Sequence, residues 1–104
     1  MRAFVVEAPR RGRVAEVGEP RVGRGEVLVR VRACGVCATD RHIFDGVYLA
    51  RYPIIPGHEI AGEVVAVGEG VEKYREGDRV TVAHHVPCNT CHYCLSGHHS
   101  VCDT

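Results

Sequence analysis

Four of the six cysteines stand close together near the end of the 104-residue sequence. They are Cys88, Cys91, Cys94 and Cys102, in the pattern C-x2-C-x2-C-x7-C. This spacing lets one short loop place four thiolates around a tetrahedral ion, and zinc is the ion that suits four sulfur ligands. Four protein ligands leave no open coordination position, so the pattern predicts a structural zinc site.

The surrounding segment, residues 84–104, has no hydrophobic alternation and cannot fold by burying apolar side chains. We call it the Cys-rich lobe. Structural zinc binding is worth roughly 10–16 kcal/mol in small peptides, and we expect it to order this lobe. Two disulfides would need an oxidising compartment, whereas an iron–sulfur cluster is chemically open to four thiolates. A mixed Cys/His site is also conceivable, but we interpret the nearby histidines as loop residues: His84, His85, His92, His98 and His99.

A second constellation lies in GHEIAGEVVAVGEGV, residues 57–71. It resembles the signature of the zinc-containing alcohol dehydrogenases, G-H-E-x2-G-x5-G-x2-V, and the matching residues are Gly57, His58, Glu59, Gly62, Gly68 and Val71. CGVCATDRH, residues 34–42, resembles the first zinc-ligand segment of the same family. The Cys-rich lobe also occurs in that family at this spacing. The chain therefore resembles the N-terminal part of a medium-chain, zinc-dependent dehydrogenase.

The resemblance implies a mainly β fold, a GroES-like partly open β-barrel that carries the zinc-ordered lobe. Residues 1–104 would form the N-terminal part of the catalytic domain. The nucleotide-binding domain and the third protein ligand of the catalytic zinc, a Cys or a Glu, would lie beyond residue 104, because no G-x-G-x-x-G motif occurs here. We expect a fragment or truncated product that is inactive alone, with zinc in the lobe.

The same resemblance assigns a catalytic zinc to Cys37 and His58. Glu59 would be an alternate ligand or lie beside the ion. Asp40 would accept a hydrogen bond from the free ring nitrogen of His58 and so fix its orientation. In the isolated chain we expect this site to be empty, weakly occupied, or completed by water, Glu59 or a neighbouring molecule.

The resemblance also bears on three further residues of the segment 34–42. Thr39 would be the hydroxyl that takes the substrate proton, and His42 would pass that proton to solvent. Cys34 is not a ligand in the family, and we expect a small buried thiol there.

The reaction implied is oxidation of a small alcohol or polyol, or reduction of a carbonyl, with hydride transfer to or from NAD or NADP. The complete enzyme would be a homodimer or homotetramer. The alternative is a free-standing zinc-binding module that acts in protein or nucleic-acid interaction. A chaperonin-like oligomer, suggested by the barrel alone, does not explain the ligands.

The amino-acid composition restricts the kinds of partner that we expect the chain to bind. Thirteen Lys and Arg balance thirteen Asp and Glu, so the chain has no net charge to attract nucleic acid. No apolar run approaches the roughly 20 residues that span a bilayer, and the N-terminus lacks the pattern of a signal peptide. We therefore expect a cytoplasmic protein with neither a nucleic-acid nor a membrane partner.

The elements that must position these residues are mostly strands. Hydrophobic alternation and turn residues predict them at residues 3–6, 13–17, 26–33, 60–67 and 79–83. Gly62 inside the fourth segment predicts a bulge or a close backbone approach. Residues 34–44 read as a turn leading into a short helix, with Thr39 or Asp40 as its cap.

Overall fold

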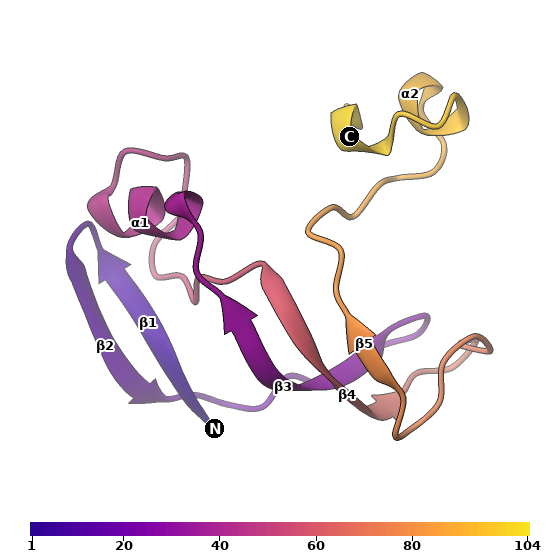
Figure 1. The fold of residues 1–104 in the computed structure, drawn as a ribbon, viewed down its shortest axis with the longest axis horizontal. Coiled ribbons are helices and arrows are strands. Elements are labelled where there is room, and N and C mark those ends of the chain that lie inside the picture. The colour runs from indigo at the N-terminus through magenta and orange to yellow at the C-terminus, as the bar shows by residue number, and fades with distance from the viewer.

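The computed structural model describes all 104 residues, and most of its regular structure is strand. β1 (Arg2–Ala8) and β2 (Arg11–Glu16) form an antiparallel hairpin. β3 (Val27–Gly35), β4 (Glu59–Val67) and β5 (Arg79–Thr81) form a second antiparallel sheet in the order β3-β4-β5. The two sheets do not close on each other (Figure 1). The mainly β, partly open architecture is therefore confirmed.

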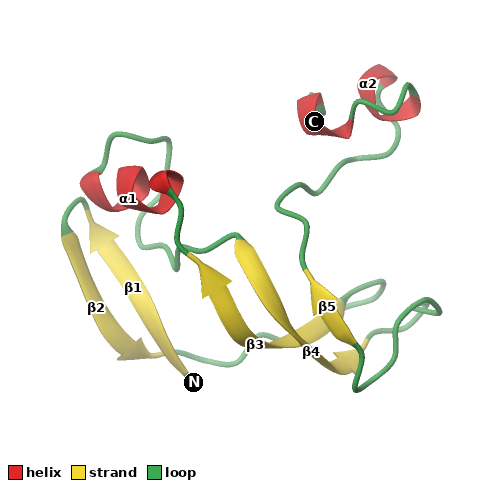
Figure 2. Cartoon of the chain, viewed as in Figure 1, coloured by secondary structure: helices red, strands yellow, loops and turns green.

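Three short helical elements complete the chain. α1 (Ala38–Asp45) follows β3 directly, and α2 (His92–Leu95) and the 3-10 helix η1 (His99–Val101) lie in the Cys-rich lobe. Figure 2 shows the helices in red at two separate places, α1 above the strands and the lobe beyond an extended segment. No helix is long and apolar enough to cross a membrane.

The pairing of β3 with β4 is irregular where the sequence predicted irregularity. Val31 lies opposite Gly62 and Ala33 opposite Ala61, so β3 has one extra residue at this point. Val64 is fully buried beside this bulge. A Cβ atom at Gly62 would collide with the carbonyl oxygen of Arg30. The close backbone approach expected at Gly62 is confirmed.

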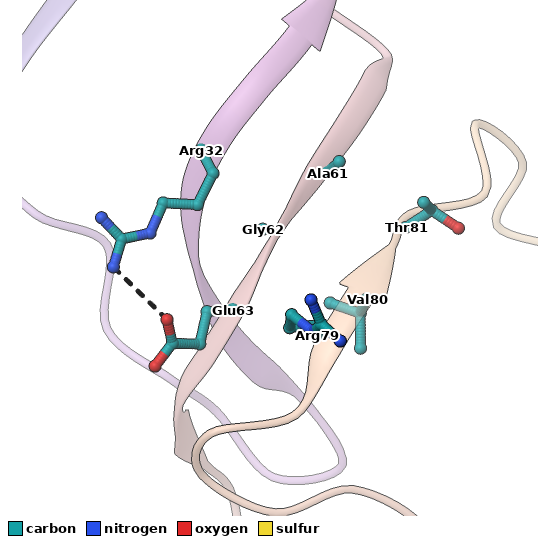
Figure 3. Close-up of a pocket in the computed structure, with 7 residues that line it drawn as sticks. All are labelled: Arg32, Ala61, Gly62, Glu63, Arg79, Val80 and Thr81. Atoms are coloured by element: carbon teal, nitrogen blue, oxygen red, sulfur yellow. Dashed lines mark hydrogen bonds and ion pairs between the residues drawn. The ribbon is translucent and has the colours of Figure 1, made fainter.

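Gly62 also lies at a hollow of about 670 Å³ on this sheet (Figure 3). Arg32 from β3 and Glu63 from β4 form an ion pair of 3.3 Å beside it, and Arg79 comes from β5. None of the predicted site residues lines this hollow. This hollow is therefore separate from the predicted metal sites.

The strands differ from the predicted segments mainly at their ends. β3 begins at Val27 and continues past residue 33 to Gly35 because Gly35 still pairs with Glu59. β2 ends at Glu16, and β5 ends at Thr81 because pairing with β4 stops at Ala61. The longer β3 matters most, since it carries the chain directly to the segment with the predicted ligands.

The buried core is small. Only Val6, Gly62, Val64 and Cys94 are buried. Large apolar side chains lie open, including Leu49 at 98% exposure. Outside the two sheets, an isolated antiparallel bridge between Val6 and Ile54 connects β1 to the segment after α1.

Replacing Gly62 by alanine tests the close approach of β3 and β4. Because the new Cβ meets the Arg30 carbonyl, we expect Gly62→Ala to lower the free energy of unfolding of the protein by about 1–3 kcal/mol. Urea unfolding measures the change. Gly18→Ala is the matched control, since nothing lies within 4 Å of that position. Equal stability of the two variants would contradict the argument.

Candidate metal centres

The start of α1 is held by a capping box that contains a predicted ligand. Cys37 is the N-cap, with an extended backbone, and its Sγ accepts a hydrogen bond from the Thr39 backbone N–H at 3.2 Å. In return, Asp40 Oδ2 accepts from the Cys37 backbone N–H at 3.0 Å. The prediction that Thr39 or Asp40 caps the helix is wrong: Cys37 is the cap and Asp40 is its reciprocal partner. A thiol takes the place usually held by a hydroxyl or carboxylate.

Strand pairing brings the second predicted ligand to this cap. Gly35 at the end of β3 pairs with Glu59 at the start of β4, so Cys37 and His58 leave the sheet side by side. Cys37 Sγ lies 3.2 Å from His58 Nε2, although the residues are 21 positions apart. A Glu59 carboxylate oxygen joins them, and the three ligand atoms all lie within 4.8 Å of one another. The structure thus gathers the three residues assigned to the catalytic zinc.

Asp40 reaches this cluster with its other oxygen. Its Oδ1 lies 3.5 Å from His58 Nδ1, and that oxygen is buried with no hydrogen-bond partner. A buried carboxylate oxygen without a partner is costly, and the facing imidazole nitrogen is the group that can satisfy it. A proton on Nδ1 would leave Nε2, the nitrogen beside Cys37, free to bind a metal ion. This donor set fits the arrangement common around zinc-bound histidines.

Local hydrogen bonds shift the titration of both ligands. The pKa of Cys37 is lowered, first by the Thr39 hydroxyl and then by the Thr39 backbone N–H. The pKa of His58 is raised, chiefly by Cys37, with Asp40 adding to the effect against desolvation. A lowered thiol pKa favours the thiolate, which is the form that binds metal.

The structure separates the two residues assigned to proton transfer. Thr39 is half-buried beside the Cys37 sulfur. His42 lies one helical turn later, is exposed, and forms no hydrogen bond with Thr39. The structure therefore places Thr39 at the cluster and His42 on the surface beside it.

Sequence reasoning missed a neighbour of this cluster. The His84 ring lies 6.3 Å from the His58 ring in an edge-to-face arrangement, and the His85 ring lies 4.0 Å from that of His84. β5 pairs with the first part of β4, and Val82 N donates to Ile60 O at 3.0 Å. This pairing places His84, just after β5, beside the cluster. Knowing that β5 pairs with β4 would have predicted this position.

The four remaining cysteines meet in the Cys-rich lobe. All six cysteines of the chain are free, and the sulfurs of these four lie within 4.8 Å of one another: Cys88, Cys91, Cys94 and Cys102. Backbone N–H groups point at the sulfurs, as in the 3.2 Å contact from Cys91 N to Cys88 Sγ. Four convergent sulfurs with N–H donors around them can hold a tetrahedral metal ion.

The pKa values within this group diverge. Hydrogen bonds from Thr104 and then Thr90 lower the pKa of Cys88 to about 5. Burial raises the pKa of Cys94 to about 12. A nearby cation, such as a bound metal ion, lowers the pKa of a buried thiol by stabilising its thiolate form.

The structure corrects the expectation for Cys34. This thiol was expected to be buried, but it is exposed at the edge of a cavity of about 490 Å³ that Phe4 and Phe44 also line. β3 is the edge strand of its sheet, so Cys34 has a paired strand on one side only. Cys34 belongs to neither group of metal-ligating atoms.

Comparison with known proteins gives one consistent result. The alcohol dehydrogenase GroES-like domain family matches residues 23–104. The chain is 44% identical over 107 residues to an alcohol dehydrogenase of Geobacillus stearothermophilus and 38% identical over 104 residues to D-arabinitol dehydrogenase 1 of Uromyces fabae. These matches cover 99% and 100% of the chain but only 32% and 30% of the relatives.

A solved structure agrees with this result over the whole chain. The rspB alcohol dehydrogenase from Escherichia coli CFT073, complexed with NADH, superimposes with a TM-score of 0.93 at 40% identity. It covers 100% of the chain, which corresponds to 30% of that protein. The family match, the relatives and the fold together show that the chain belongs to the alcohol dehydrogenase family, in its GroES-like domain.

Proposed function

We propose that residues 1–104 form the N-terminal part of the catalytic domain of a zinc-dependent dehydrogenase that oxidises a small alcohol or polyol. The observation that carries the proposal is the convergence of Cys37, His58 and Glu59 with the buried Asp40 oxygen behind His58. Relatives named as alcohol and D-arabinitol dehydrogenases support the substrate class. The NADH in the rspB structure supports a nicotinamide dinucleotide as hydride acceptor, bound by a domain outside these residues.

The chain's own residues prepare the site for the ion. Cys37 offers a thiolate, His58 offers Nε2, and Glu59 offers a carboxylate that can hold or release the metal. Asp40 keeps the His58 ring in place through Nδ1. A zinc ion held there acts as a Lewis acid on an alcohol oxygen and makes its proton acidic.

Thr39 is positioned to take that proton. It is the only hydroxyl-bearing residue in the first turn of α1, directly after the Cys37 ligand. His42 follows one turn later on the surface, where it can pass the proton to solvent. Oxidation of an alcohol to a carbonyl releases a hydride and a proton. A bound nicotinamide dinucleotide would accept the hydride, Thr39 would take the proton, and His42 on the nearby surface would pass it to solvent.

In this proposal the metal site of the Cys-rich lobe has a structural role. Its four cysteines fill a tetrahedral coordination sphere and leave no position for substrate. The similarity to dehydrogenases over the whole chain favours this role over a free-standing interaction module.

Removing one lobe sulfur tests the structural zinc. We expect Cys91→Ser to lose one zinc ion from the full-length protein and to unfold the lobe, because roughly 10–16 kcal/mol of metal binding orders such segments. Metal analysis and proteolysis within residues 84–104 provide the readouts. Cys34→Ser is the control, since that exposed sulfur lies outside both clusters. Unchanged zinc content in Cys91→Ser would refute the four-cysteine site.

Removing the imidazole ligand tests the catalytic zinc. His58→Ala should abolish alcohol oxidation and the second zinc ion while sparing zinc in the lobe, because the two clusters share no residue. Steady-state kinetics and zinc content of the same preparation are measured together. Retained turnover in His58→Ala would contradict the proposed role.

Neutralising Asp40 tests the support behind His58. Asp40→Asn should lower zinc affinity at the Cys37–His58 site by about 10–100-fold, the usual cost of losing such a partner. Chelator competition measures that affinity. Asp45→Asn is the matched control on the same helix, because Asp45 pairs with Arg10 and Arg41 instead. Equal affinities in the two variants would exclude a role for Asp40.

A further inference from the structure

The side chain of Glu59 reaches the cluster of Cys37 and His58 by lying across a glycine. Gly35 and Glu59 are the final pair of residues between β3 and β4, at the end of the sheet next to α1 (Figure 1). A Cβ atom at Gly35 would collide with Glu59 Oε2 and would lie 3.2 Å from Glu59 Cδ. The Glu59 carboxylate therefore occupies space that a side chain at position 35 would fill.

No polar partner within the protein holds this carboxylate in place. Glu59 forms no hydrogen bond and no ion pair, and the residue is exposed. One of its oxygens nevertheless lies within 4.8 Å of the ligand atoms of Cys37 and His58. Holding a long side chain in one conformation costs entropy, so the conformation depends on the space that is open to it.

The glycine at position 35 is not required by its backbone conformation. Gly35 is a strand residue, and its φ is not positive. Glycine weakens a strand, because it has no side chain to pack and loses more backbone entropy on folding than other residues do. All three atoms nearest to a Cβ at this position belong to Glu59. The consequence of having glycine here is therefore room for the Glu59 side chain.

We propose that Gly35 is a positioning residue for the metal site, because its lack of a side chain lets the Glu59 carboxylate face an ion held by Cys37 and His58. The inference rests on the proposed function and adds to it a residue that touches neither metal nor substrate. Alanine at position 35 should displace the flexible end of Glu59 from the cluster and leave the pairing of β3 with β4 intact. Loss of the carboxylate should then speed the release of zinc.

Chelator competition on the zinc-loaded protein tests the proposal. Gly35→Ala should lower zinc affinity at the site of Cys37 and His58 about tenfold, the lower end of the effect of losing support for a ligand. Zinc in the Cys-rich lobe should be retained equally and serves as the internal reference. Gly23→Ala is the matched control, because a Cβ atom there also meets a glutamate carboxylate, that of Glu26, outside both clusters.

A double-substitution cycle separates positioning from a general loss of structure. Glu59→Ala removes the carboxylate and keeps the Cβ atom, so it should lower zinc affinity at least as much as Gly35→Ala does. The double variant should bind zinc no more weakly than Glu59→Ala alone, because Gly35 acts through Glu59. A further loss in the double variant, or a lower urea midpoint for Gly35→Ala than for Gly23→Ala, would indicate a structural role and overturn the proposal.

Cobalt reports on the ligands themselves, because it takes the same kinds of donor atom as zinc. With Co²⁺ in the site of Cys37 and His58 and zinc kept in the lobe, the visible absorption spectrum of Gly35→Ala should match that of Glu59→Ala. A spectrum identical to that of the wild type would overturn the proposal. A protein with these metal effects that oxidises no alcohol would refute the proposed function and retain the role of Gly35. Alcohol oxidation with unchanged zinc affinity in Gly35→Ala would do the reverse.

Discussion

The antiparallel pairing of β3 with β4 is the constraint on which the proposed catalytic site depends. The two strands stay paired up to Gly35 and Glu59 in spite of two register shifts, and the segments with the proposed ligands begin just beyond them. A shift of one residue would move every side chain of β4 to the opposite face. The bulge opposite Gly62 and the absence of a side chain there fix the register, because the Arg30 backbone occupies the space of a Cβ.

Asp40 couples this long-range pairing to the local structure of α1. One carboxylate oxygen accepts from the Cys37 backbone N–H and closes the capping box, while the other faces His58 across 3.5 Å. The Asp40 carboxylate that caps α1 therefore also faces the His58 ring. Because both ligands share one partner, substitutions at Cys37, Asp40 and His58 should not be additive.

The sequence predicted the strands and the grouping of Cys37, His58 and Glu59 better than it predicted the other contacts between segments. Alternation of apolar and polar residues predicted β3 and β4, because the two faces of a sheet differ in exposure to solvent. The glycine at position 62 predicted the bulge. Cys37 as helix cap was missed, since thiols are uncommon at that position and propensity favours Thr39 or Asp40. His84 was missed for a different reason: its place beside His58 follows from β5 pairing with β4, a contact between distant segments that no local pattern encodes.

The burial of the Cys-rich lobe is consistent with the proposal that a metal ion orders it. Cys94 is the only buried residue of the lobe, while Val86 and Leu95 are 96% and 75% exposed. Apolar burial contributes about 25 cal/mol per Å², so side chains this open contribute little. The lobe instead brings four sulfurs together, including a Cys94 thiol that burial holds in its protonated form. Under the proposed function, a bound zinc ion would favour the thiolate of Cys94, with the proton released to water, and the four sulfurs would then hold the lobe together.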